Sequence, residues 1–105
     1  MLSLEILNQQ ELQTYKLEGN LEGMEALDLR NNLTKSIEQK ARQVTVDLTK
    51  VDSMDLTGFN ALVMIKKEVI QNGRKFTLLV NNDNPVHDFI QLSKLTFNIS
   101  LIKNS

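Results

Sequence analysis

The chain has 105 residues, a length that suits one compact domain, and we expect residues 1–105 to form that single domain. It contains no cysteine, which excludes disulfides, thiolate catalysis and cysteine-based metal sites, and a formal net charge of -1 without a basic stripe argues against nucleic-acid binding. Since no signal-like N-terminus and no apolar run near the roughly 18 residues that span a bilayer are present, we expect a cytoplasmic protein without direct membrane insertion.

The first segment of the chain predicts a hairpin of two strands. Leu2, Leu4 and Ile6 alternate with polar residues, as in a strand with one buried face. A second short run, Glu11–Glu18, follows after three polar residues and ends at Gly19.

The next stretch changes to helical spacing. Between Glu22 and Ala41, apolar residues recur three or four positions apart, and charged or polar residues lie between them. The residues expected to face the core are Met24, Leu27, Leu29, Leu33 and Ile37. The short β-branched run Val44–Leu48 then predicts a buried strand.

The second half of the chain alternates helices and strands. Helical spacing resumes after Gly58 and stops at Asn72-Gly73, a typical C-terminal signal. The core face of this helix is expected to carry Phe59, Leu62, Val63, Ile65, Val69 and Ile70. Phe76–Val80 predicts a strand, Pro85 suits the first residue of a third helix, and Phe97–Ile102 alternates like a final strand. The third helix is expected to bury Val86, Phe89, Ile90 and Leu92.

The predicted order is therefore β-β-α-β-α-β-α-β. Strict alternation after the opening hairpin predicts crossovers between parallel strands, so we expect an α/β domain with one mixed sheet and helices packed against it.

Residues suited to catalysis are few. His87 is the one histidine and lies among ordinary polar neighbours on the third predicted helix, where a surface or half-buried histidine is the favoured interpretation. Known nucleophile, zinc-protease and P-loop patterns do not occur. We therefore expect a protein that is not an enzyme and that needs neither a cofactor nor a metal.

One strand-to-helix junction is a candidate site. In open α/β sheets functional groups gather where strands end and helices begin, and the free N–H groups of a helix start favour an anion. A hydroxyl in the segment Met54–Gly58 could accept a phosphoryl group there. The alternative is that Asp55 or Thr57 only caps the helix, and the residues taken alone favour this alternative.

The sequence around this junction resembles the signature of the STAS family, named for sulfate transporters and anti-sigma-factor antagonists. That signature is an apolar strand ending in Asp-Leu, a short spacer, and Asp-Ser-Ser/Thr-Gly-Leu at the start of a helix; here Val44–Phe59 is similar to it. Leu17–Glu22 resembles the family's turn before the first helix, and Val86–Leu95 resembles its late helix.

The resemblance implies a partner-switching antagonist. It would bind an anti-sigma factor that is also a Ser/Thr protein kinase, would be released when that kinase phosphorylates the hydroxyl residue before the glycine, and would be restored by a phosphatase. Carried onto this chain, the phosphoacceptor is Thr57, and Asp55 occupies the acidic position of the motif. Gly58 would allow a partner's backbone to approach, and Glu22 would lie beside the phosphoacceptor.

The chain departs from the family pattern at three positions of the expected partner-binding segment. Leu56 replaces a residue that is often Ser, Thr57 replaces the commoner Ser, and Phe59 replaces the usual Leu. The sequence leaves open weak homodimerisation and one alternative function, that of a stand-alone STAS subunit of a membrane-lipid ABC transporter.

Overall fold

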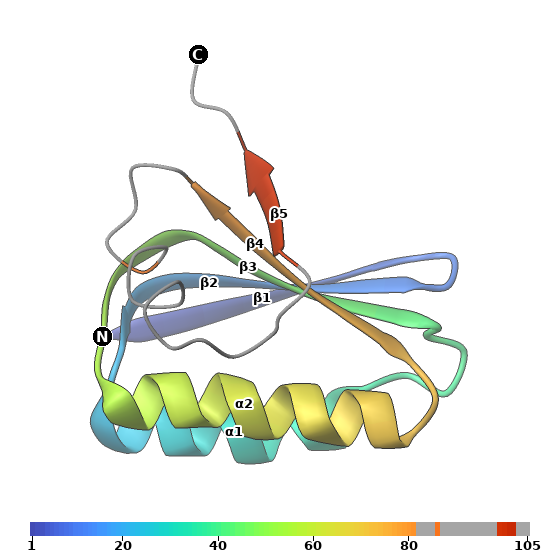
Figure 1. The fold of residues 1–105 in the computed structure, drawn as a ribbon, viewed down its shortest axis with the longest axis horizontal. Coiled ribbons are helices and arrows are strands. Elements are labelled where there is room, and N and C mark those ends of the chain that lie inside the picture. Colours follow the sequence, from blue (N-terminus) through green and yellow to red (C-terminus); the bar gives the residue numbers. More distant parts are fainter. Residues whose placement is uncertain (82–85, 87–98, 103–105) are drawn as a thin grey trace.

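The computed structural model describes residues 1–81, 86 and 99–102, which form a sheet and two helices in two layers (Figure 1). The strands are β1 (Leu2–Gln9), β2 (Leu12–Leu21), β3 (Gln43–Met54), β4 (Lys75–Asn81) and β5 (Ile99–Ile102). The helices are α1 (Gly23–Ser36) and α2 (Leu56–Gln71). Of these described helices, neither is long and apolar enough to cross a membrane.

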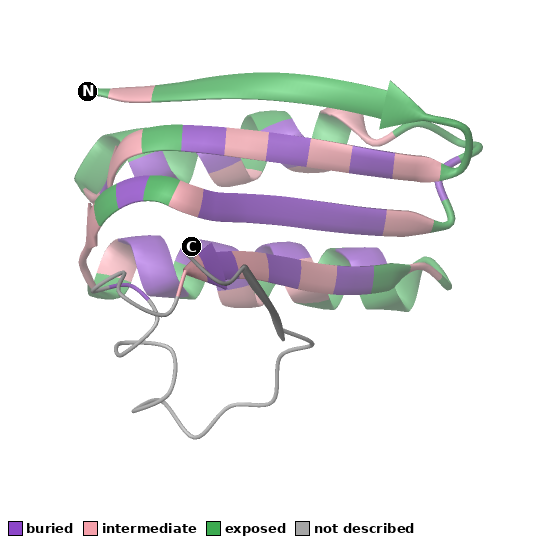
Figure 2. Cartoon of the chain, turned by 90° about the horizontal axis from the view of Figure 1, so that it is seen from above, coloured by how far each residue is buried: buried purple, intermediate pink, exposed green. Residues whose placement is uncertain are grey.

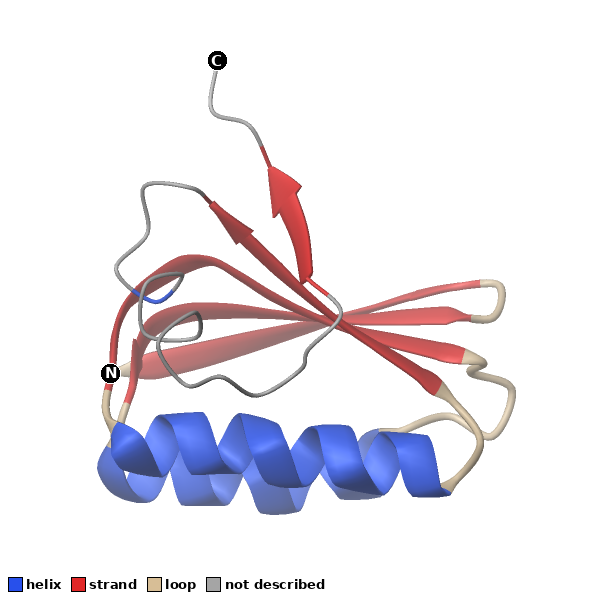
Figure 3. Ribbon diagram, viewed as in Figure 1, coloured by secondary structure: helices blue, strands red, loops and turns tan. Residues whose placement is uncertain are grey.

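The sheet is mixed, and its strand order follows the chain from β1 to β5. β1 and β2 form an antiparallel hairpin, whereas β2, β3, β4 and β5 pair in parallel. Both described helices lie side by side on one face of the sheet (Figure 3). This arrangement confirms the α/β class and the mixed sheet. In the region of the expected third helix the structure describes Val86 alone, which is helical and buried; Phe89, Ile90, Leu92 and His87 lie outside the described residues.

The core lies between the helices and the three strands β2, β3 and β4. Alternate residues of β2 and β4 are buried, whereas Val44–Leu48 of β3 are buried without a break (Figure 2). α1 contributes Ala26, Leu29 and Leu33, and α2 contributes Phe59, Ala61, Leu62, Ile65 and Val69. Each large apolar side chain buried in this way stabilises the fold by about 1.5–3 kcal/mol relative to its exposure to water. The packing fixes both helices against the sheet.

Two expectations about α1 are wrong. The helix ends at Ser36 rather than near Ala41, because the backbone at Ile37 is extended and the Glu38 N–H donates to the Gln13 side chain, 3.0 Å away. Met24 and Leu27 do not face the core; the Met24 side chain is 70% exposed.

The far end of α1 is held by β2. Gln13 Nε2 donates to the Ser36 carbonyl at 3.2 Å, and the Tyr15 hydroxyl lies 2.8 Å from Ser36 Oγ. Burial raises the pKa of Tyr15 above its usual value of 10.0; the hydrogen bond with Ser36 opposes this rise and the charge of Glu38 adds to it.

β1 and β3 also differ from expectation. β1 forms as predicted, but Leu4 and Ile6 are exposed because β1 lies at the edge of the sheet. β3 continues six residues beyond the predicted end at Leu48, since its polar second half still pairs with β2 as far as Met54.

Candidate functional site

The starts of α1 and α2 lie next to each other at the end of the sheet where β2 and β3 finish (Figure 1). β2 ends at Leu21 and β3 ends at Met54, and these two residues are partners in the parallel pair. Each strand passes into its helix through a single residue, Glu22 or Asp55. Two helix N-termini, each with free N–H groups and a positive dipole end, therefore share one small surface.

Asp55 joins the two helix starts through two hydrogen bonds to its one carboxylate, which we call the Asp55 clamp. Its Oδ1 accepts a hydrogen bond from the Gly58 N–H at 2.8 Å, and its Oδ2 accepts one from the Gly23 N–H at 3.1 Å. The first bond is a regular N-terminal cap of α2, so the expected cap is present at Asp55. The second bond reaches α1, where the positive φ of Gly23, +56°, is a conformation that glycine adopts without strain.

Ser53 connects the ends of β2 and β3 beneath this clamp. Its hydroxyl lies 3.0 Å from Asn20 Oδ1 and 3.0 Å from Glu22 Oε2, and its single proton serves one of these acceptors at a time. Glu22 is the N-cap residue of α1 but makes no side-chain cap, so its carboxylate stays with Ser53 beside Asp55. The site therefore has an acidic rim.

Leu56 and Thr57 form the first turn of α2. The Leu56 side chain is 65% exposed although it is large and apolar. Thr57 is half-buried, and among the described residues none makes a hydrogen bond with its hydroxyl. The hydroxyl therefore has no competing structural role in this part of the chain, and it lies where the helix dipole favours a negative group.

Gly58 and Phe59 have internal positions. A Cβ atom placed on Gly58 would lie 1.9 Å from the carbonyl oxygen of Leu21, so α2 can pass this close to β2 only with glycine here. Phe59 is 6% exposed and belongs to the core. The expectation that Gly58 leaves room for a partner's backbone therefore needs correction, because the room is filled by the chain's own β2.

Sequence reasoning missed three contributors to this surface. Met24 was expected in the core, yet it lies one residue after the Gly23 amide that Asp55 holds, and it is as exposed as Leu56. Gly23 and Ser53 position the carboxylates of Asp55 and Glu22. The position of Met24 directly after a glycine, in the first helical turn, was the available signal for its exposure.

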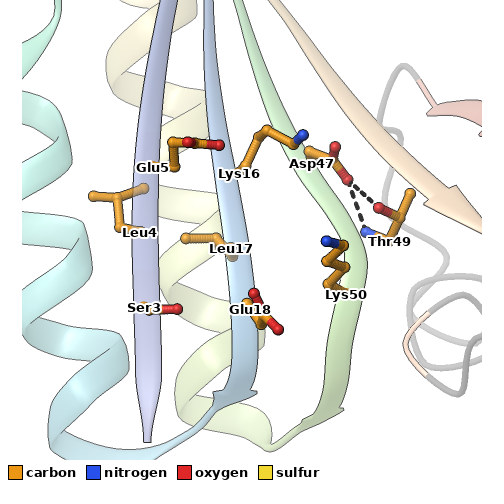
Figure 4. A pocket seen from close by; sticks show the side chains of 9 residues that line it. All are labelled: Ser3, Leu4, Glu5, Lys16, Leu17, Glu18, Asp47, Thr49 and Lys50. Carbon is orange, nitrogen blue, oxygen red and sulfur yellow. Dashed lines mark hydrogen bonds between the residues drawn. The ribbon is translucent and has the colours of Figure 1, made fainter.

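A hollow of about 210 Å³ lies on the face of the sheet opposite the helices (Figure 4). Charges of opposite sign alternate across it, because Lys16 is the partner of both Glu5 and Asp47 and Lys50 is the partner of Glu18. Asp47 Oδ1 also accepts hydrogen bonds from the N–H and the hydroxyl of Thr49. The lining holds the three carboxylates of Glu5, Glu18 and Asp47 and the two ammonium groups of Lys16 and Lys50, so most of the charge is compensated within the hollow. In the described part of the chain no cluster of metal-binding side chains occurs.

Comparison with known proteins places this geometry in context. The family model of the STAS domain matches residues 3–105. An anti-sigma factor antagonist, SpoIIAA in its unphosphorylated form, superimposes with a TM-score of 0.72 at 15% identity, covering 93% of this chain and 87% of that one. An anti-sigma factor antagonist from Mycobacterium paratuberculosis superimposes with a TM-score of 0.76 at 13% identity, covering 94% and 85% of the two chains.

Proposed function

Because the chain belongs to the STAS domain family, we propose that it is an anti-sigma-factor antagonist that binds an anti-sigma factor with Ser/Thr kinase activity. The observation that carries the proposal is the first turn of α2. There an exposed Leu56 adjoins Thr57, whose hydroxyl makes no hydrogen bond with any described residue, next to the Asp55 clamp. The names of the two similar structures, both anti-sigma factor antagonists, support the same function.

The docking surface consists of Glu22, Met24, Asp55, Leu56 and Thr57. Two large apolar side chains on a small surface with an acidic rim suit a partner that offers an apolar pocket bordered by basic or amide groups. Gly58 and Phe59 lie beneath this surface and hold it in shape.

Phosphorylation of Thr57 is the proposed switch. The Thr57 oxygen attacks the γ-phosphorus of an ATP bound by the partner, the bond to the β,γ-bridging oxygen breaks, ADP leaves, and the hydroxyl proton passes to a base of the partner. The product carries about −1.5 to −2 charge at neutral pH.

The new charge would act on the interface more than on the fold. The positive starts of α1 and α2 stabilise a phosphate, so the domain keeps its structure. In the complex, however, the phosphate would lose water next to Leu56 and would face the carboxylates of Asp55 and Glu22. The partner is therefore released, and a phosphatase that removes the phosphate restores binding. In this mechanism the chain is a phosphoryl acceptor and not a catalyst, and it needs no cofactor.

The test is affinity capture from lysate of the source organism, with wild type, Thr57→Glu and Gln71→Glu as baits and mass spectrometry as the readout. Gln71→Glu adds the same charge at the exposed far end of α2 and serves as the matched control. We expect wild type and Gln71→Glu to capture an ATP-binding Ser/Thr kinase that Thr57→Glu loses. With the purified kinase and ATP, wild type should take up phosphate and Thr57→Val should not.

Two outcomes contradict the proposal. Equal capture of the kinase by all three baits would remove Thr57 from the interface. Equal capture of transporter subunits would instead support the alternative, a stand-alone STAS subunit of a membrane-lipid ABC transporter, and would leave the anti-sigma function without support.

A further inference from the structure

β1 is an edge strand whose outer edge pairs with no other described strand. It runs for eight residues and pairs with β2 alone among the described strands. Edge strands usually carry a lysine, a proline or a bulge that prevents pairing with another chain. β1 has none of these; its residues are LSLEILNQ and its register with β2 is regular throughout.

The hairpin defines which backbone groups point outward. Gln9 and Leu12 flank a two-residue turn, and such a flanking pair exchanges both backbone hydrogen bonds. Because bonded and outward-facing residues alternate along a strand, Leu4, Ile6 and Asn8 direct their N–H and C=O groups away from β2. Leu2 also points outward, and its N–H is taken by Glu25 Oε2 at 2.8 Å. No described residue bonds the outward groups of the other three.

Apolar side chains accompany this open edge. Leu4, Ile6 and Leu7 are 37%, 40% and 45% exposed, a concentration of exposed large apolar residues within one strand. Glu5 is the one charged residue of the strand, and it lies opposite Lys16 of β2. Glu5 is therefore partly neutralised and gives weak protection against association.

We propose that β1 is a self-association surface, on which a second copy of this chain pairs its own β1 in antiparallel fashion. A two-fold axis at Ile6 places each Ile6 opposite the other, and Leu4 opposite Asn8 of the second copy. This register pairs all three outward-facing residues. It also places Glu5 opposite Leu7, whereas a shift that opposed Leu4 to Ile6 would set the two Glu5 side chains against each other.

The same features determine the strength of the dimer. Stable interfaces between proteins bury at least about 1,200 Å² of accessible surface. One pair of eight-residue strands buries less than this, so association should be weak and concentration-dependent. The dimer joins two sheets into one continuous sheet. It involves neither Leu56 nor Thr57, so it is independent of the proposed partner switch.

Sedimentation equilibrium across micromolar to millimolar protein tests the proposal. We expect wild type to shift from monomer to dimer, and Ile6→Lys to weaken association at least tenfold because two ammonium groups would meet at the axis. Ile70→Lys makes the same change at an exposed site of α2, where the parent side chain is 50% exposed, and should associate like wild type. Circular dichroism of both variants confirms that each is folded.

Cysteine cross-linking tests the register, since the chain has no native cysteine. A hydrogen-bonded antiparallel pair has a Cα separation of about 5.5 Å, within the range that a disulfide spans. Ile6→Cys should therefore form a covalent dimer under mild oxidation, whereas Leu4→Cys should not. A monomeric wild type at millimolar concentration, undiminished association of Ile6→Lys, or cross-linking of Leu4→Cys alone would overturn the proposal.

Discussion

Gly58 lies where the start of α2 contacts the end of β2, and its replacement by alanine tests that close approach. An added Cβ would lie 1.9 Å from the Leu21 carbonyl oxygen, whereas real Cβ atoms essentially never come within 3.0 Å of another atom. The helix start and β2 would therefore have to separate by about 1 Å. Leu21 cannot yield easily, because its side chain is fully buried and its carbonyl accepts the Asp55 N–H.

The expected loss follows from the opposing effects. Overpacking costs about 1–3 kcal/mol, and a displaced helix start also weakens the Asp55 cap, which contributes about 1 kcal/mol. Alanine returns up to about 1 kcal/mol as the better helix former. With the full gain in helix propensity, we therefore expect Gly58→Ala to lower the free energy of unfolding by about 1–3 kcal/mol.

Urea denaturation followed by circular dichroism measures this loss, which should lower the midpoint by about 1 M or more. Asn60→Ala, at an exposed position of the same helix, isolates the helix-propensity gain and should be neutral or slightly stabilising. Gly23→Ala isolates the cost of a positive φ without a clash, about 1 kcal/mol. If Gly58→Ala were as stable as Asn60→Ala, the close contact with Leu21 would be refuted.

Three further changes test other parts of the structure by the same denaturation assay. Asp55→Ala removes the acceptor of both the Gly23 and the Gly58 amides and should lower the free energy of unfolding by about 2 kcal/mol. Asp55→Asn keeps one acceptor oxygen and should lower it by about half as much. Equal losses in the two variants would contradict the Asp55 clamp. Because burial raises the pKa of Tyr15, unfolded tyrosine ionises before folded tyrosine, so stability should fall above about pH 10 by up to about 1.4 kcal/mol per pH unit. Tyr15→Phe should remove that fall in stability. Tyrosinate absorbance reports on Tyr15 alone, since it is the one tyrosine of the chain. If the stability of the variant fell with pH as steeply as that of wild type, ionisation of Tyr15 would be excluded as the cause. Gln10 has a positive φ of 54° in the hairpin turn, so Gln10→Gly should stabilise the domain by about 0.5 kcal/mol, and a loss would show that the turn is not strained there.

Periodicity was sufficient to predict the mixed sheet, because β-branched runs and helical spacing alternate strictly along the chain. It failed where a long-range contact determines the result. β3 extends to Met54 through Thr49, Lys50 and Asp52, whose polar side chains conceal a strand that pairs with β2. α1 ends early because Gln13, far from it in sequence, binds the Glu38 N–H.

Burial was predicted less well than secondary structure for a related reason. Alternation shows which residues share a face but not whether another element covers that face. In β1 the face with Leu4 and Ile6 lies at the edge of the sheet, where α1 covers it incompletely. Met24 has helical spacing with Leu27, yet both lie outside the buried stripe of Ala26, Leu29 and Leu33.

The candidate site could be located from the sequence, since a strand-to-helix junction is a general place for functional groups. Its internal connections could not be predicted. The bond from Gly23 to Asp55 and the contact between Gly58 and Leu21 both join segments that only the packed sheet brings together. The role of Thr57 as phosphoacceptor stays a prediction.

The carboxylate of Asp55 also links the local motions of two helices. The N–H groups of Gly23 and Gly58 donate hydrogen bonds to the same side chain, so rotation of Asp55 exposes both amides to water at once. Fraying of α1 and fraying of α2 therefore become one opening event rather than two, and hydrogen exchange at these amides should share one opening free energy. A partner that immobilises Leu56 in the first turn of α2 would in this way also slow the exchange of α1, a helix start it need not touch.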